Sequence, residues 1–135
     1  MSDTRPIPKP DGYVPTGPFW DGAKHGALVL QYCRDTNRFQ HYPRPVSLAT
    51  GSRNLEWRAV SGKGTIYAVT IVRVPGPGLE GRLPLIVATI TLDEGVRIIA
   101  NILDAGAATA TIGARVVLAW DYLNAETPYP AFRLA

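Results

Sequence analysis

Two short segments between residues 31 and 57 constrain this chain more than any other part of its sequence. Their spacing is that of two Cys-x-x-Cys loops, which hold zinc when four thiolates meet around one tetrahedral ion. Here the first loop reads Cys33-x-x-Thr36 and the second reads Ser47-x-x-Thr50, so one thiol remains at four ligand positions. One thiolate and three hydroxyls do not hold zinc. We therefore expect a metal-free ribbon of hairpins that is stabilised by packing.

Size and composition are those of an ordinary globular protein. The chain has 135 residues, which suits one domain, and a core of that size needs no metal or disulfide. Hydrophobic residues make up 46% and charged residues 19%, which excludes fibrous and disordered classes. Cys33 is the single cysteine, so no internal disulfide can form. No apolar run approaches a membrane span, and residues 1–10 lack a signal-peptide core, so we expect a cytoplasmic protein.

Three regions are expected along the chain. Residues 1–17 are rich in proline, which fixes φ and removes a backbone donor, so they form an extended arm. Residues 18–53 contain a short helix and the metal-free ribbon. Residues 54–135 contain a barrel and a tail.

The helix is predicted at residues 19–26, because Pro18 suits a helix start and Gly26 suits a stop. Phe19 and Trp20 are adjacent, so they cannot share one helical face. One of them should pack on the body of the protein while the other faces a groove or a partner.

The part of the chain after residue 54 alternates between strand and turn signals. Five barrel strands are predicted, at residues 55–60, 65–74, 83–92, 96–103 and 113–123. A small alanine-rich segment precedes the last strand and is expected to form a short helical turn, and residues 124–135 form the tail. Five strands with such an insertion are typical of the OB-fold, a partly open Greek-key barrel. The predicted fold is mostly β: a short N-terminal helix and degenerate zinc-ribbon hairpins, followed by a five-stranded OB-fold barrel.

No catalytic motif is recognisable. Residues 61–65 read Ser-Gly-Lys-Gly-Thr, but the upstream glycine of a phosphate loop is missing and a strand follows instead of a helix. His25, Cys33 and His41 could supply at most three metal ligands, and their spacing is not typical of a zinc site. The sequence therefore indicates neither a nucleotide loop nor a metal centre.

Basic residues are concentrated in the middle of the chain. The net charge is only +3, yet residues 34–82 carry eight Lys and Arg against three Asp and Glu. Such a stretch attracts phosphates, either of a nucleotide-bearing cofactor or of nucleic acid, or it is simply a solvated face.

A series of short motifs runs through the chain in a definite order. The series is Phe19-Trp20, Gln31-x-Cys33-x-x-Thr36, Pro43-Arg44, Ser47-x-x-Thr50-Gly51-Ser52, Glu56-Trp57, Ser61-Gly62-x-Gly64-Thr65-x-Tyr67, Pro84, Glu94-Gly95 and Ile112-Gly113. In this order the motifs resemble the OB-fold, acyl-CoA-associated family with an N-terminal rubredoxin-like zinc ribbon, formerly a domain of unknown function. The resemblance spans roughly residues 18–132, and the zinc ligands are degenerate here.

The resemblance implies a non-catalytic accessory subunit of an acyl-CoA-processing complex. Its partner would be a thiolase-like acyltransferase or aldolase, or a hot-dog-fold hydratase, and this partner would hold the catalytic residues. We expect a hetero-oligomer with no tightly bound cofactor and no zinc, and a coenzyme A thioester as candidate ligand. The residues expected at the partner interface are Tyr13, Phe19, Trp20 and Tyr42. Those expected to meet the phosphates of acyl-CoA are Arg44, Arg58, Lys63, Arg73 and Arg82.

Two alternatives stay open. A single-stranded nucleic-acid-binding OB-fold protein would use the basic stretch together with stacking aromatics. Against it, the strands at 65–74 and 83–92 contain one aromatic, Tyr67; binding that falls sharply with salt and ignores coenzyme A would favour it. The third hypothesis is a small enzyme with Cys33 as nucleophile, which full activity of Cys33→Ser would remove.

Overall fold

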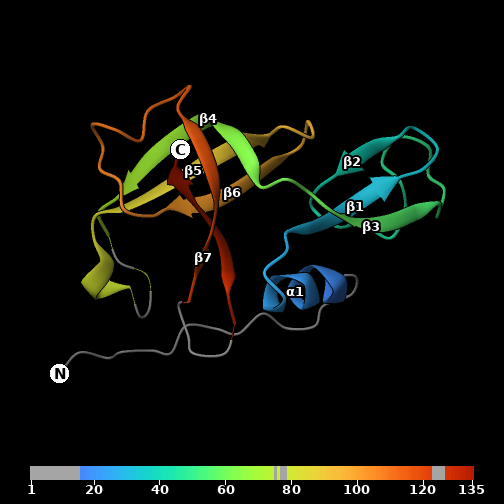
Figure 1. Cartoon of the computed structure of the whole chain (residues 1–135), viewed down its shortest axis with the longest axis horizontal. Coiled ribbons are helices and arrows are strands. Elements are labelled where there is room, and N and C mark those ends of the chain that lie inside the picture. The colour runs from blue at the N-terminus through green and yellow to red at the C-terminus, as the bar shows by residue number, and fades with distance from the viewer. Residues whose placement is uncertain (1–15, 75, 77–78, 123–126) are drawn as a thin grey trace.

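The part of the chain that the structure describes forms a small three-stranded sheet and a closed five-stranded barrel. In the computed structural model this part comprises residues 16–74, 76, 79–122 and 127–135. The elements are α1 (Gly17–Lys24), β1 (Val29–Cys33), β2 (Arg38–Gln40), β3 (Leu55–Ala59), β4 (Lys63–Val72), the 3₁₀ turn η1 (Glu80–Arg82), β5 (Leu85–Leu92), β6 (Arg97–Ile102), β7 (Arg115–Asp121) and β8 (Tyr129–Leu134). The sheet has the order β2-β1-β3, and the barrel has the order β4-β5-β6-β8-β7. Figure 1 shows the sheet and the barrel side by side, with α1 below the segment that links them.

The helix lies within two residues of its predicted position. Pro18 occupies its first turn, and Gly26, with φ of 75°, follows its end, as a left-handed residue after a helix commonly does. Phe19 is buried, whereas Trp20 is only partly buried. The two adjacent rings therefore differ in burial, although both line the cleft described below. Among the described residues, no helix is long and apolar enough to cross a membrane.

The small sheet contains the predicted ribbon hairpin and one further strand. β1 pairs antiparallel with β2, with Cys33 opposite Arg38. β1 also pairs antiparallel with β3 over five positions, from Val29 opposite Ala59 to Cys33 opposite Leu55. The prediction of residues 55–60 as the first barrel strand was therefore wrong: these residues complete the ribbon.

The fifth barrel strand comes from the segment that was predicted to be a tail. β8 pairs antiparallel with β7 over six positions and parallel with β6 over two, and it closes the barrel. Its strand signal is weak because Pro130 lies within it and Pro128 just before it, and proline cannot donate to a ladder. The predicted fold class and the number of barrel strands are confirmed, but two strand assignments are exchanged.

Closure of the barrel depends on close packing at the start of β4. This strand pairs with β7 at its start and with β5 along its whole length, with a bulge between Ile66 and Ala68. At Gly64 a Cβ atom would lie 2.7 Å from both Ile90 Cγ2 and Thr91 O. A side chain at this position would therefore push β4 away from β5.

One hydrophobic core runs from the helix through the barrel. Ile66, Ile90 and Phe132 are at most 1% exposed and fill the barrel interior. Phe19 and Leu30, from α1 and β1, belong to the same cluster of buried residues. The ribbon and the barrel are therefore packed on each other and not merely tethered.

Candidate functional site

The former zinc position is filled by a hydrogen-bonded cluster. Cys33 Sγ lies 3.2 Å from Ser47 Oγ, and both residues are 2% exposed. The amides of Ala49 and Thr50 donate to Ser47 Oγ at 3.2 and 3.3 Å. Hydrogen bonds from the side chains of Ser47 and Thr36 lower the pKa of the Cys33 thiol. One thiol among hydroxyls does not suit zinc, and the described residues contain no cluster of three or more His, Cys, Asp or Glu that could hold a metal.

Two buried glutamines tie the loop after β2 to the sheet. Gln31 donates from Nε2 to Arg44 O at 2.8 Å and accepts from Arg44 N at 2.9 Å. Gln40 donates from Nε2 to Gln31 Oε1 at 2.9 Å and to Val46 O at 3.1 Å, and its own Oε1 accepts from Leu48 N at 3.0 Å. These amide contacts fix the loop where metal coordination would otherwise fix it.

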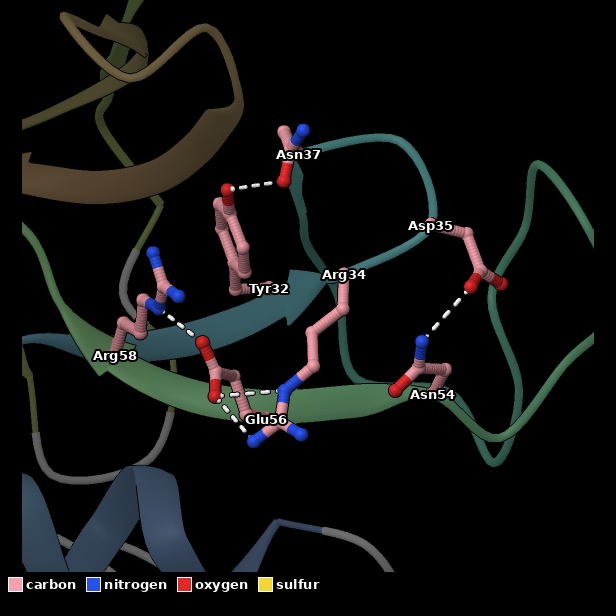
Figure 2. Close-up of polar contacts among 7 residues, drawn as sticks. All are labelled: Tyr32, Arg34, Asp35, Asn37, Asn54, Glu56 and Arg58. Atoms are coloured by element: carbon pink, nitrogen blue, oxygen red, sulfur yellow. Dashed lines mark hydrogen bonds and ion pairs between the residues drawn. The ribbon is translucent and has the colours of Figure 1, made fainter.

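Asp35 holds the far end of the same loop. Its carboxylate accepts from Thr50 Oγ1 at 3.0 Å, Ser52 Oγ at 2.5 Å and Asn54 Nδ2 at 2.8 Å; Figure 2 shows the bond to Asn54. These bonds, with that of Ser52 foremost, lower the pKa of Asp35. Together with the glutamines, they give the ribbon a polar network that needs no ion.

We predict that chelators leave this ribbon intact. Incubation with EDTA should leave the melting temperature unchanged, because the Gln31–Gln40 and Asp35 networks supply the contacts that zinc would make. Differential scanning calorimetry measures this. A drop of several degrees on EDTA treatment, reversed by added zinc, would show that the ribbon depends on metal after all.

The outer face of the ribbon sheet carries a row of paired charges (Figure 2). Glu56 accepts from Arg34 Nε at 2.9 Å and Nη2 at 2.6 Å, and it also pairs with Arg58. The bond from Arg34 is the main cause of the lowered pKa of Glu56. The Arg58 guanidinium carbon lies 3.7 Å from the centre of the Tyr32 ring, whose hydroxyl donates to Asn37 Oδ1 at 3.1 Å. Each of these charged side chains therefore has a partner within the chain.

A cleft of about 250 Å³ lies where the helix, the ribbon and the barrel meet. We call it the aromatic cleft. It is lined by Thr16, Phe19, Trp20, His41, Tyr42, Pro43, Ile98, Ile99, Tyr129 and Pro130. Two of these, Tyr42 and Ile99, are exposed apolar side chains, with Ile99 58% exposed. Ile99 N donates to Tyr42 Oη at 3.2 Å, which joins the barrel to the ribbon at the edge of the cleft.

A continuous series of rings forms its wall. The ring centres of Tyr42 and His41 are 4.0 Å apart, and those of His41 and Phe19 are 5.7 Å apart. Phe19 and Trp20 meet edge to face at 4.9 Å, and Trp20 and Tyr129 at 5.5 Å. Three of the four predicted interface residues therefore lie together. The fourth, Tyr13, lies outside the described residues.

His41 makes the cleft sensitive to acid. Burial lowers its pKa to about 4 from 6.5, and neither ring nitrogen has a hydrogen-bond partner in the described chain. Between pH 6.5 and 4 the unfolded state binds a proton that the folded state does not, so stability falls as the pH falls through this range. Lowering the pH from 6.5 to 5 should cost about 1.5 kcal/mol.

The matched variant is His41→Phe, which keeps an aromatic ring and removes the titration. Urea unfolding of both proteins at pH 6.5 and 5 measures the difference. We expect His41→Phe to lose most of the pH dependence and to be no less stable at pH 7, because an unpartnered polar group is removed. Equal pH dependence in the two proteins would contradict a buried neutral His41.

The five residues predicted to meet acyl-CoA phosphates do not lie at one place. Lys63 begins β4 and Arg73 follows its end, so they are about 30 Å apart. Arg44 is exposed on the ribbon loop. Arg58 is paired with Glu56, as described above, and Arg82 makes a two-pronged ion pair with Asp121, at 2.9 and 2.6 Å. Two of the five, Arg58 and Arg82, are therefore engaged by carboxylates within the chain.

Sequence reasoning missed Ile99 and Tyr129 as parts of the cleft. For Ile99 a signal existed: Ile98 and Ile99 are adjacent on a strand, so one isoleucine must point out of the barrel. Tyr129 had no such signal, because its segment was not predicted to be a strand.

Comparison with known proteins agrees with this architecture. Residues 20–56 match the family model "ChsH2, rubredoxin-like zinc ribbon domain", and residues 57–121 match "ChsH2, C-terminal OB-fold domain". The chain is similar, with 29% identity and a TM-score of 0.80, to a chain of the solved structure "Ltp2-ChsH2(DUF35) aldolase"; the match covers 96% of this chain and 98% of that one.

Two curated relatives are also similar. The first is the "Probable enoyl-CoA hydratase alpha subunit" of Thermomonospora curvata, 32% identical over 119 residues, or 87% of this chain and 37% of the relative. The second is a "DUF35 domain-containing scaffold protein" of Pyrococcus furiosus, 41% identical over 61 residues, or 45% of each chain. The chain thus spans a little over one third of the hydratase subunit and less than half of the scaffold protein. The two family models together cover residues 20–121 without a break, and the chain belongs to the ChsH2 family of OB-fold proteins with an N-terminal rubredoxin-like zinc ribbon.

Proposed function

We propose that this chain is a non-catalytic accessory subunit of an acyl-CoA-processing enzyme complex. The partner is a thiolase-like or hot-dog-fold enzyme, and the two form a hetero-oligomer. Relatives support this: one is named as a hydratase α subunit, another as a scaffold protein, and a third forms part of an aldolase structure. The aromatic cleft is the observation in this chain that carries the proposal.

The cleft has the composition of an interface core. It is lined by aromatic and aliphatic side chains without an Asp, Glu, Lys or Arg among its described lining residues. Charge depletion and enrichment in Tyr, Trp and Phe distinguish the buried centre of a protein interface from other surface. The cleft also joins helix, ribbon and barrel, so an enzyme seated there would hold both halves of the chain in one orientation.

In the described chain, Cys33 is not hydrogen-bonded to a histidine that could act as its base. Cys33 is bonded to Ser47, whereas His25 Nδ1 bonds to Asp21 O at 2.7 Å and both nitrogens of His41 are unpartnered. A catalytic cysteine needs a base within hydrogen-bond reach. This arrangement supports an enzyme subunit elsewhere as the source of the chemistry.

Acyl-CoA would then bind at the junction with the enzyme, and we infer that its phosphates meet a subset of the five predicted cations. Arg44, Lys63 and Arg73 are the better candidates, since none of them forms an ion pair with a described carboxylate, whereas Arg58 and Arg82 each hold one. The bound form would be a coenzyme A thioester held jointly with the partner.

Affinity purification of the tagged chain from its own cells tests the proposal. We expect a thiolase-like or hot-dog-fold enzyme to elute in stoichiometric amount, identified by mass spectrometry. The purified chain alone should turn over no acyl-CoA, and the recovered complex should. Elution of the chain by itself, or full activity of the chain alone, would contradict the accessory role.

A further inference from the structure

A second cavity, of about 260 Å³, lies over the position where related ribbons hold zinc. We call it the ribbon cavity. The residues that matter for its chemistry are Cys33, Thr36, Arg38 and Ser47 from the ribbon, and Val96 and Arg97 from the barrel. It therefore spans the ribbon and the start of β6, and it shares His41 with the aromatic cleft.

The charge of this cavity is positive and uncompensated. Arg38 and Arg97 line it, and no Asp or Glu is among its described lining residues. Neither guanidinium forms an ion pair with a carboxylate of the described chain, in contrast to Arg34, Arg58, Arg82, Arg115 and Arg133. An anion bound in this cavity would be attracted by both charges.

Both arginines are carried by ordered backbone. Arg38 lies on β2 directly opposite Cys33 of β1. The guanidinium carbon of Arg97 lies 3.7 Å from the centre of the Tyr67 ring, and its Nε lies 3.4 Å from Thr91 Oγ1. Stacking on a ring fixes the plane of a guanidinium, so less entropy is lost when its remaining N–H groups bind a ligand.

The floor of the cavity favours an anion over a cation. Apart from the two arginines, its polar side chains include the neutral hydroxyl groups of Thr36 and Ser47. Zinc would need several thiolates or imidazoles, and the lining of this cavity includes one cysteine and one histidine. A doubly charged oxyanion matches the two arginines, and planar guanidinium groups bind phosphate through paired hydrogen bonds.

We propose that the ribbon cavity binds a phosphate group of a phosphorylated small molecule, through Arg38 and Arg97, at the place where related ribbons hold zinc. The site goes beyond the accessory role and needs no partner subunit. The sequence analysis did not predict this site, because Arg38 and Arg97 are 59 positions apart in the chain.

Titration of the ¹⁵N-labelled full chain with inorganic pyrophosphate tests the site. We expect saturable amide shifts concentrated at residues 36–38, 47–49 and 96–97. The double variant Arg38→Gln/Arg97→Gln should weaken binding at least about tenfold, since each charge-assisted hydrogen bond contributes more than a neutral one. Both side chains are exposed, so the variant should keep the wild-type spectrum elsewhere.

Arg53→Gln is the matched control. It removes one exposed arginine of the basic stretch that does not line the cavity, and pyrophosphate should bind this variant as it binds the wild type. Coenzyme A and dephospho-coenzyme A identify the group that is recognised: binding of both assigns the pyrophosphate, and binding of coenzyme A alone assigns the 3′-phosphate.

Several outcomes would overturn the inference. The site is excluded if pyrophosphate causes no amide shifts, or causes shifts only near other cations. It is also excluded if the double variant binds pyrophosphate with the same affinity as the wild type. A single-stranded oligonucleotide that binds more tightly than any small phosphate, with shifts spread over the barrel, would replace this site with a nucleic-acid surface. A chain that binds no phosphate but still co-purifies with an enzyme would leave the proposed function standing.

Discussion

Ile99→Glu should strongly weaken association with the enzyme subunit while leaving the chain folded. Ile99 is 58% exposed at the edge of the aromatic cleft, so the fold does not need its side chain. In a complex that covers the cleft, the new carboxylate would be desolvated without a partner. We expect affinity to fall by about 30-fold or more, the scale of a hot-spot loss. Biolayer interferometry with the co-purified enzyme measures the change.

Ile112→Glu provides the control. Ile112 is also an exposed isoleucine, 70% exposed, but it lies in the loop before β7 and is not part of the cleft lining. The same change of charge and size there should leave affinity within about twofold, as expected for surface sites away from an interface. Equal losses in the two variants would show that net charge, and not the cleft, decides association.

Arg82→Ala should destabilise the barrel by about 3 kcal/mol, because it leaves a buried carboxylate without its partner. The Asp121 side chain is only 9% exposed, and its two oxygens accept from Arg82 Nη1 and Nη2. Asn101 Nδ2, at 3.5 Å, is too distant to replace them. The pair fastens η1 to the end of β7. Urea unfolding measures the loss.

Arg73→Ala, on an exposed arginine just after β4, should change stability by no more than about 0.5 kcal/mol. The double variant Arg82→Ala/Asp121→Ala should recover part of the loss, because no unpaired charge is then left buried. If Arg82→Ala leaves stability unchanged but weakens acyl-CoA binding in the complex, Arg82 is a ligand residue and not a structural one.

Local sequence signals predicted the local parts of this fold. Pro18 and Gly26 delimited the helix, and the β1–β2 hairpin and strands β4 to β7 followed from propensity and turn residues. Pairing could not be predicted in the same way. β3 follows the ribbon in sequence and has ordinary strand propensity, and nothing local says whether it joins β1 or the barrel. Proline within β8 concealed the strand that closes the barrel.

The parts of the candidate site that were predicted are those whose signal lies in neighbouring residues of the sequence. The adjacency of Phe19 and Trp20 predicted one ring at a groove, and both rings line the aromatic cleft. Charges were predicted less well, because the partners that neutralise them are distant: Arg82 and Asp121 are 39 positions apart. A count of basic residues cannot distinguish an arginine that is held by a carboxylate from one that is available to a ligand.

Hydrogen exchange of the chain, free and in complex with the co-purified enzyme, tests the central claim most directly. The claim is that the chain docks on an acyl-CoA enzyme through the aromatic cleft. It predicts slower exchange on binding in residues 16–24, 41–43, 97–102 and 129–134. Protection confined to the outer face of the ribbon, at residues 32–38 and 55–59, or no protection at all, would contradict it.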